Sequence, residues 1–269
     1  MDLRSRVLTY TEDLPPDGEY HPPGESERER LADGVAELLT GDAAAADQKL
    51  APLGLGVTRL TDTASGRRYD EIAAAGPGPA AQWGRLYLTA DSSPRWNVQV
   101  PHPTADRHTD ELGTRLLEET PGGALVVAGA HRRAGDDGAA DVAHREDSAF
   151  HTIVVELQQH GVPGVQLHGF ADADDRPYDA VLSTGAAENT LGEVTALADR
   201  MERDGLEVCR GWQSRCPLEG ATNVQGKAAQ RLHVPFVHVE LAPGARGTGS
   251  DASVTADALA DLTATWNDG

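Results

Sequence analysis

The sequence predicts a single α/β domain with three layers, in which helices cover both faces of a mixed, mostly parallel central sheet. Short apolar runs rich in valine, bounded by glycine or proline, alternate with amphipathic stretches of helical periodicity. Strands of this continuous apolar kind are typical of a sheet that is buried on both faces. The 269 residues are enough for one large domain with a sizeable core. We expect residues 1–25 to form an N-terminal arm and residues 26–269 to form the domain.

The first elements of the domain follow from local patterns. Residues 26–40 are predicted to form a helix, because leucine and valine recur there at helical spacing behind a Ser-x-x-Glu cap pattern. A second helix is expected over residues 42–50. Residues 55–61 and 68–72 are predicted to form two short strands around a turn. A loop rich in glycine, proline and alanine is expected over residues 73–81.

The alternation of apolar runs and amphipathic stretches is clearest in the rest of the chain. The predicted strands cover residues 96–100, 124–128, 165–167, 180–182 and 236–241. The predicted helices between and after them cover residues 109–119, 148–160, 191–204 and 252–266. This order of elements is the basis for the α/β prediction.

The charge of the chain excludes several classes of partner. There are 23 Lys and Arg residues against 43 Asp and Glu residues, which gives a formal net charge of −20. Binding to nucleic acid or to an anionic membrane requires clustered positive charge, so neither partner is expected. No apolar run approaches the roughly 18 residues that a membrane-spanning helix needs. The pattern does not indicate an oligomeric state.

The two cysteines, Cys209 and Cys216, are too few for a disulfide scaffold or a cysteine-rich zinc site. Their spacing permits a small disulfide-closed loop in an extracellular protein, and two free buried thiols are equally compatible with it. The first four residues contain no apolar signal core. The protein is therefore either cytoplasmic or secreted with its signal removed.

Two histidines directly follow predicted strands. His102 comes after the strand at 96–100, and His168 directly follows the strand at 165–167. Ligands of open α/β sheets bind beyond the carboxyl ends of the strands. Asp106 follows His102 closely, and Glu111 is an alternative carboxylate. Two imidazoles and one carboxylate hold a catalytic Zn²⁺ with one position open to water, although histidines at strand ends also simply hydrogen-bond neighbouring loops.

A second local pattern, His108-x-x-Glu111, has the spacing found in zinc carboxypeptidases. It lies at a predicted helix start, where Glu111 is equally suited to complement the helix dipole. His102 directly follows a strand, and we therefore rank it above His108 as a ligand.

Positive charge gathers in one segment of this acidic chain. His131 and Arg132 follow the strand at 124–128, and Arg145 lies a short distance further on. Arginine binds carboxylates through two parallel hydrogen bonds, which favours recognition of a substrate carboxylate. The alternative is internal ion pairing with the acidic residues nearby, namely Asp136, Asp137, Glu146 and Asp147.

The last predicted strand carries Glu240 between valine and leucine, and Arg246 follows it. The alternation of side chains along a strand places His238 and Glu240 on the same face. A carboxylate beside a metal site serves hydrolases as general base. The alternative is that Glu240 faces solvent on a half-exposed strand.

Three segments, in this order, resemble the zinc-dependent poly-γ-glutamate hydrolase family. The segments are His102 to Glu111, the Gln-Leu-His-Gly run that ends at Gly169, and the strand with Glu240, which Arg246 follows. The resemblance covers about residues 96–246. The sequence lacks the glycines that follow the first histidine in the family, and its carboxylate stands one position earlier. A weaker likeness runs to N-formylglutamate amidohydrolases.

The resemblance implies a carboxypeptidase-like fold in which His102, Asp106 and His168 bind Zn²⁺. It also implies that Glu240 activates the water and that His131 or an arginine stabilises the oxyanion. The expected substrate is a small molecule or peptide whose carboxylate is bound by Arg132, Arg145 or Arg246. Because histidine ligands must be neutral, activity is expected to fall in mild acid.

We therefore predict a metal-dependent hydrolase that cleaves peptide, γ-glutamyl or N-acyl amide bonds. The alternative is a protein without catalytic activity that holds a small anionic ligand with the same arginines. Members of the family that the sequence resembles act on extracellular polymers, and this favours secretion over a cytoplasmic location.

Overall fold

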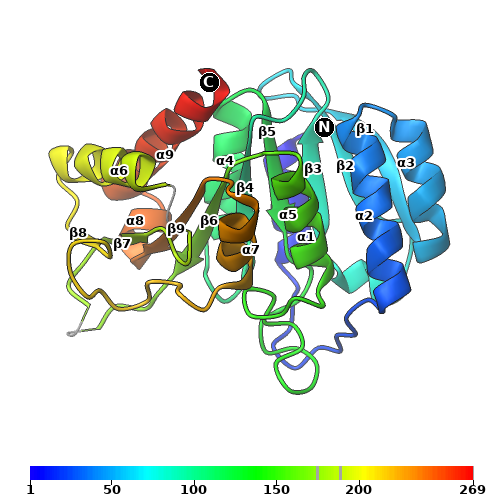
Figure 1. Cartoon of the computed structure of the whole chain (residues 1–269), viewed down its shortest axis with the longest axis horizontal. Helices are drawn as coiled ribbons and strands as arrows, with labels where there is room; N and C mark the ends of the chain where they lie inside the picture. Colours follow the sequence, from blue (N-terminus) through cyan, green and yellow to red (C-terminus); the bar gives the residue numbers. More distant parts are fainter. Residues whose placement is uncertain (174–175, 188–189, 269) are drawn as a thin grey trace.

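The computed structural model describes residues 1–173, 176–187 and 190–268, and it places the predicted strands side by side in one sheet (Figure 1). The strands are β1 (Leu55–Thr61), β2 (Arg68–Ala74), β3 (Arg85–Thr89), β4 (Trp96–Val100), β5 (Gly123–Val127), β6 (Gly164–Gly169), β7 (Ala180–Ser183), β8 (Val208–Arg210) and β9 (Phe236–Leu241). Across the sheet their order is β1-β2-β3-β5-β4-β6-β9-β7-β8.

The centre of the sheet is parallel and one edge is antiparallel. Strands β5, β4, β6 and β9 run parallel to one another, whereas β1, β2 and β3 form an antiparallel meander that joins β5. The predicted mixed sheet is confirmed. Within the described residues parallel and antiparallel pairings are equally frequent, four of each, rather than mostly parallel. Two of the antiparallel pairings arise because short connections join β1, β2 and β3, and such connections require antiparallel pairing. The other two are between β3 and β5 and between β7 and β9.

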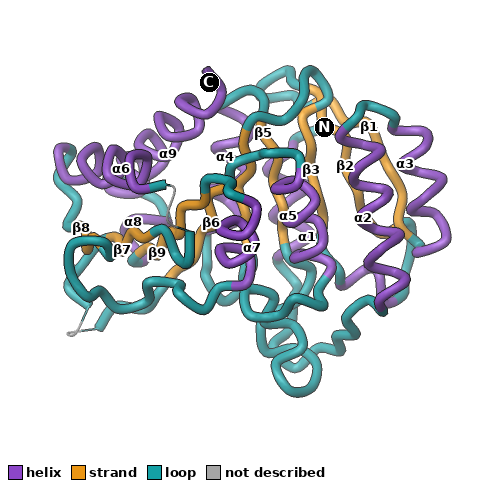
Figure 2. Tube along the Cα trace, viewed as in Figure 1, coloured by secondary structure: helices purple, strands orange, loops and turns teal. Residues whose placement is uncertain are grey.

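Helices cover both faces of this sheet (Figure 2). They are α1 (Leu3–Thr11), α2 (Glu25–Leu39), α3 (Ala43–Leu50), α4 (Thr109–Glu119), α5 (Ala149–Gln159), α6 (Leu191–Arg203), α7 (Val224–Leu232), α8 (Pro243–Arg246) and α9 (Ser250–Asp268). Among the helices of the described residues, none has both the length and the apolar character needed to cross a bilayer.

Alternate residues of β5 show the three layers directly. Leu125 and Val127 belong to the apolar core under α1, α4, α6 and α9, whereas Ala124 and Val126 belong to the core under α2, α3 and α5. Side chains of a strand point alternately to the two faces of its sheet. The two cores therefore lie on opposite faces, as the predicted three-layer architecture requires.

The segment predicted to be an arm contains a helix. In α1, Leu3 and Val7 are completely buried in the core beside α4, and the Asp2 side chain caps the helix by accepting a hydrogen bond from the Ser5 amide at 2.7 Å. Leu3 and Val7 are the only aliphatic residues of α1 that are buried, and a repeat of two positions is too short to recognise as helical periodicity in the sequence. Residues 12–24 then lead to α2 without a further helix or strand.

The two cysteines form a disulfide. Cys209 lies in β8 at the end of the sheet, and Cys216 lies in the loop that follows it. Both are buried in a small cluster with Phe170 and Val181. The bond closes the short loop that the spacing permits, and it fixes that loop to the edge of the sheet.

Candidate metal centre

The parallel strands bring distant polar residues to one edge of the sheet. His102 lies two residues beyond the end of β4, and His168 lies near the end of β6. Glu240 lies near the end of β9, directly beside His168 in the parallel register. Neighbours in register point to the same face of a sheet. The fold therefore assembles these side chains where the carboxyl ends of the central strands meet.

The three residues predicted as metal ligands lie together. Asp106 Oδ2 is 3.3 Å from His102 Nδ1 and 3.2 Å from His168 Nδ1. Each of the three residues offers one ligand atom, and these three atoms lie within 4.8 Å of one another. All three side chains are buried. The two imidazole rings meet edge to face, with centroids 5.1 Å apart.

The outer nitrogen of each imidazole ring is held by another residue. His102 Nε2 lies 2.8 Å from Asp141 Oδ1, and Asp141 in turn accepts a 2.8 Å hydrogen bond from Arg132. His168 Nε2 lies 2.8 Å from Gln166 Oε1. Metal-binding histidines characteristically use one nitrogen for the metal and the other for such a partner. Both Nδ1 atoms therefore face Asp106, and this donor set fits a divalent transition metal.

The protonation of the two carboxylates suits this role. Burial raises the pKa of Asp106, but hydrogen bonds and charges from His102 and His168 lower it more, so that the pKa lies well below its usual range. The pKa of Asp141 is likewise lowered, because the contacts with His102 and Arg132 outweigh its burial. Both carboxylates are therefore ionised at neutral pH.

Glu240 differs from these carboxylates. It is 9% exposed, and none of the described residues forms a hydrogen bond or ion pair with its carboxylate. Burial raises the pKa of Glu240 to about 8, and the charge of Asp106 adds to this effect against the opposing Arg132 and Arg246. A carboxylate with a pKa near neutrality is suited to exchange a proton during a reaction.

Arg246 is buried near Asp106 and Glu240, with which it interacts electrostatically. Its Nη2 donates a 3.1 Å hydrogen bond to the Phe170 carbonyl, while its Nε has no partner within the described residues. The guanidinium fits only because residue 169 is glycine, since a Cβ there would lie 2.4 Å from Nε. Arg246 thus places positive charge near Glu240, whose pKa it lowers.

In the described part of the chain, the remaining predicted site residues, His131 and Arg145, form no hydrogen bond or ion pair with the three predicted ligands. His131 is partly exposed; its Nδ1 accepts a 3.1 Å hydrogen bond from the Arg133 amide, and burial lowers its pKa. Arg145 pairs with Asp147 through two hydrogen bonds of 3.0 and 2.7 Å, which matches the internal ion pair considered as its alternative role.

The alternative carboxylate, Glu111, does not join the buried group. It lies at the start of α4, where its Oε2 is 3.3 Å from His108 Nδ1 and its Oε1 is 3.3 Å from Arg4. His108 is half exposed, and it precedes α4 with a left-handed backbone (φ 69°). Within the described residues, the group that could hold a metal contains Asp106 and not Glu111.

Three further residues, for which the sequence predicts no role, touch the cluster: Asp141, Gln166 and His238. The His238 ring lies 4.8 Å from the His168 ring at a tilt of 32°, and it is buried against Gly220, where a Cβ would lie 2.5 Å from the ring. Gln166 and His238 had one visible signal, since both are polar residues inside apolar strands on the face of the predicted ligand and base. Asp141 lies in a loop, where strand periodicity gives no such signal.

The sequence matches no protein-family model and no curated protein. Several solved structures are similar to the fold at low identity. N-formylglutamate amidohydrolase from Ralstonia eutropha JMP134 is 13% identical, with a TM-score of 0.47, over 68% of this chain and 96% of that one. A bacteriophage poly-γ-glutamate hydrolase is 15% identical, with a TM-score of 0.46, over 65% and 86%. A metallo-carboxypeptidase from Burkholderia cenocepacia is 14% identical, with a TM-score of 0.41, over 92% and 69%.

These similar structures include the kind of hydrolase that the sequence resembles.

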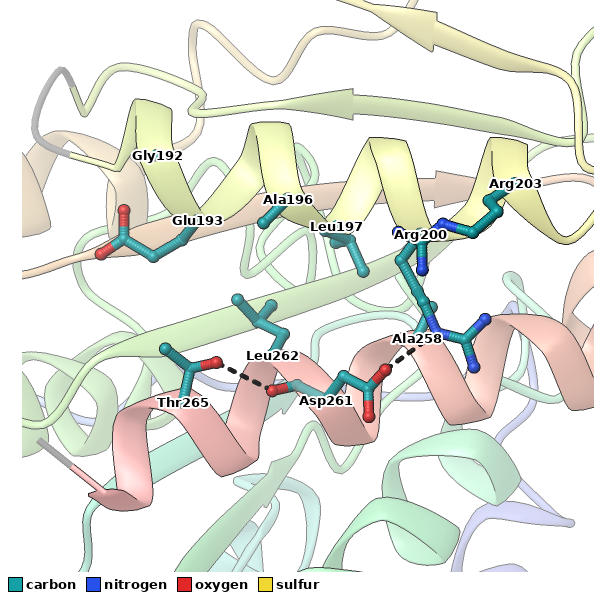
Figure 3. A pocket seen from close by; sticks show the side chains of 10 residues that line it. All are labelled: Gly192, Glu193, Ala196, Leu197, Arg200, Arg203, Ala258, Asp261, Leu262 and Thr265. Carbon is teal, nitrogen blue, oxygen red and sulfur yellow. Dashed lines mark hydrogen bonds and ion pairs between the residues drawn. The ribbon is translucent and has the colours of Figure 1, made fainter.

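A groove of about 470 Å³ lies elsewhere, between α6 and α9 (Figure 3). Leu197 and Leu262 supply apolar surface, and Arg200 is neutralised by a 2.9 Å hydrogen bond to Asp261. None of the residues that line this groove belongs to the cluster.

Proposed function

We propose that this protein is a zinc-dependent hydrolase that cleaves an amide bond in a small molecule or peptide carrying a carboxylate. The observation that carries the proposal is the convergence of His102 Nδ1 and His168 Nδ1 on Asp106 Oδ2. Each imidazole has its other nitrogen occupied, by Asp141 or by Gln166, so the Nδ1 atoms are the ones that remain for a metal.

The roles of the three ligands and the base follow from their surroundings. A divalent ion in such a site supplies Lewis acidity, which lowers the pKa of water and polarises a carbonyl oxygen. The buried carboxylate of Glu240 accepts a proton from water and then passes it to the leaving amine. Burial raises the pKa of Glu240 and makes its ionised form a stronger base, and the charge of a divalent ion beside it would lower that pKa so that the ionised form is present at neutral pH.

Positive charge near Glu240 supports a substrate with a carboxylate. The charges of Arg132 and Arg246 lower the pKa of Glu240, so both lie near its carboxylate. Arg132 uses one nitrogen for Asp141. We assign carboxylate binding to Arg132 and Arg246, while Arg145 is engaged by Asp147. His131 or Arg132 stabilises the oxyanion. A peptide, a γ-glutamyl link and an N-acyl amino acid all satisfy this description.

Metal analysis and hydrolysis test the proposal together. Purified protein is expected to hold one zinc ion per chain by elemental analysis, and His168→Ala and His102→Ala are expected to lose it. Wild-type protein is expected to hydrolyse at least one of a γ-glutamyl peptide, a dipeptide and an N-formyl amino acid. His108→Ala is the matched control, because it removes an exposed histidine outside the cluster.

The outcome of this experiment also separates the two function classes. Zinc that stays bound in the His102→Ala/His168→Ala double variant contradicts the ligand assignment. If the histidine variants lose zinc but the wild-type protein shows no hydrolysis that Glu240→Gln abolishes, the result favours a binding protein for an anionic ligand. The Cys209–Cys216 disulfide supports secretion as the setting, because such bonds persist in oxidising compartments.

A further inference from the structure

The central strands carry a continuous chain of buried amide side chains that ends at His168. Gln99, Gln166 and Gln225 are completely buried, as is Asn97, and Asn223 is nearly so. An amide has a donor end and an acceptor end, and its hydrogen-bond partners decide which way it points. The chain therefore has a direction, and that direction decides what Gln166 presents to His168.

Along the strands the direction is fixed by backbone carbonyls. Asn97 Nδ2 donates to the Pro163 carbonyl at 2.8 Å, which can only accept. Asn97 Oδ1 is therefore the acceptor for Gln99 Nε2, at 2.8 Å. Gln99 Oε1 then accepts from Gln166 Nε2 at 3.0 Å. This branch leaves Gln166 Oε1 facing His168.

Two further branches, both from residues around α7, give the same direction. Gln225 Nε2 donates to the Val142 carbonyl at 2.9 Å, so Gln225 Oε1 is the acceptor for Gln166 Nε2, at 3.3 Å. Asn223 Oδ1 accepts from the Gly226 amide at 2.9 Å, so Asn223 Nδ2 is the donor to Gln166 Oε1. Each branch ends on a backbone group whose role cannot be reversed.

His168 consequently lies between two acceptors. Gln166 Oε1 is 2.8 Å from its Nε2, and Asp106 Oδ2 is 3.2 Å from its Nδ1. If a neutral ring gives its single proton to Gln166, then the Nδ1 lone pair and the Asp106 oxygen face the same space. A cation in that space resolves the conflict. If instead the proton moves to Nδ1, the ring cannot bind a metal there.

We propose that Gln166 is a positioning residue, which holds the proton of His168 on Nε2 and so keeps Nδ1 free for the metal. The amide chain from Asn97, Gln225 and Asn223 keeps Gln166 in the orientation that does this. The purpose of the arrangement rests on the proposed metal function, but the position of the proton is a property of the metal-free protein. Gly164 provides the space for the chain, because a Cβ there would lie 2.6 Å from Gln99 Nε2.

The test is the imidazole ¹⁵N spectrum of metal-free protein at about pH 8, with His168 assigned from the signal that is lost in His168→Asn. In wild-type protein we expect Nε2 of His168 to carry a proton. In Gln166→Met the remaining acceptor is Asp106, and the proton is expected on Nδ1. In Gln166→Glu the acceptor oxygen returns, although the contacts with Gln99 and Gln225 do not, and Nε2 is expected to regain the proton.

Zinc affinity, measured by competition with a chromophoric chelator, gives a second readout. Gln166→Met is expected to bind zinc about 10- to 100-fold more weakly, which is the usual effect of losing such a partner, and Gln166→Glu is expected to recover most of the loss. Gln158→Met is the matched control, because Gln158 is equally buried and donates to the Gln225 carbonyl without touching His168. We expect it to leave zinc affinity unchanged.

The proposal would be overturned if Nε2 of His168 carried no proton in metal-free wild-type protein. This result does not depend on any variant folding. A folded Gln166→Met protein with wild-type proton position and zinc affinity would also overturn it. If the proton behaves as expected but wild-type protein binds no metal, the positioning role of Gln166 stands and the proposed function fails.

Discussion

The two faces of the central strands have opposite characters although the same short segments form both. On one face, Val165, Leu167, Val237 and Val239 are completely buried in an apolar core. On the other face of β6 and β9, the alternate positions are polar and also buried. They are Gln166, His168, His238 and Glu240. Burying polar groups costs stability unless they are paired, so the polar face costs the fold stability. Its residues are accounted for by the proposed metal site and not by folding.

The comparison predicts that substitutions on the two faces fail in different ways. Changes on the apolar face are expected to lower stability and to leave the metal site intact. Changes on the polar face are expected to abolish activity and to leave the protein folded. The following predictions test this division, from the largest expected effect to the smallest.

Glu240→Gln removes the base and retains the shape of the side chain. The rate of hydrolysis is expected to fall by about 100- to 10,000-fold, because general base catalysis contributes about this much. Zinc content is expected to stay at the wild-type level. Steady-state kinetics and elemental analysis on the same preparation check both points, and a variant with undiminished kcat would remove Glu240 from the mechanism.

Leu167→Ala alters the apolar face of β6 at the residue that precedes His168. Leu167 is completely buried, and the substitution is expected to lower the free energy of unfolding by about 2–5 kcal/mol through lost apolar contact and the cavity that remains. Urea unfolding measures the loss. Zinc binding of the folded fraction should match wild type; weakened binding would show that the two faces are coupled.

The pH dependence of metal-free protein reports on Glu240. Its folded pKa of about 8 lies above the ordinary value of 4.5, so the folded state holds a proton that the unfolded state has released between these values. The stabilising contribution is complete below about pH 4.5 and is lost as the pH rises through about 8. Unfolding in a chelator at pH 5.5 and 8.5 is expected to show a loss on the order of 2–3 kcal/mol that Glu240→Gln lacks. Equal pH dependence in both proteins would contradict the raised pKa.

Arg145→Ala provides the smallest expected effect. Its ion pair with Asp147 is more than one-third exposed on both sides, and such pairs contribute about 0–1 kcal/mol to stability. Arg132→Ala should raise KM for a substrate with a carboxylate more than Arg145→Ala does. Of these two arginines, Arg132 is the one that contacts Asp141, the partner of His102, whereas Arg145 pairs with Asp147. The reverse order of KM effects would restore Arg145 as the principal substrate contact.

Much of the fold could be predicted from local sequence. The strands Leu55–Thr61, Trp96–Val100 and Phe236–Leu241 and the helix Thr109–Glu119 have the predicted bounds, because their apolar periodicity is complete within each segment. Strand β3 and helix α7 were not predicted. Helix α7 has few large apolar residues, and it is held partly by the buried Gln225.

The site could be predicted only in part. His102 and His168 were recognisable because each follows a strand, and Asp106 because it lies near His102 in the chain. Their partners were not, because the proximity of Asp141 to His102, and of Asn223 to Gln166, depends on how distant segments cross in space. Local periodicity carries no information about such contacts.

The most direct test of the central claim is a crystal structure of zinc-loaded protein with anomalous diffraction data at the zinc edge. The account predicts one anomalous peak bound by Nδ1 of His102, Nδ1 of His168 and the Asp106 carboxylate, at about 2 Å from each. A peak bound through the Nε2 atoms, a peak at His108 and Glu111, or no peak within reach of His168 would contradict it.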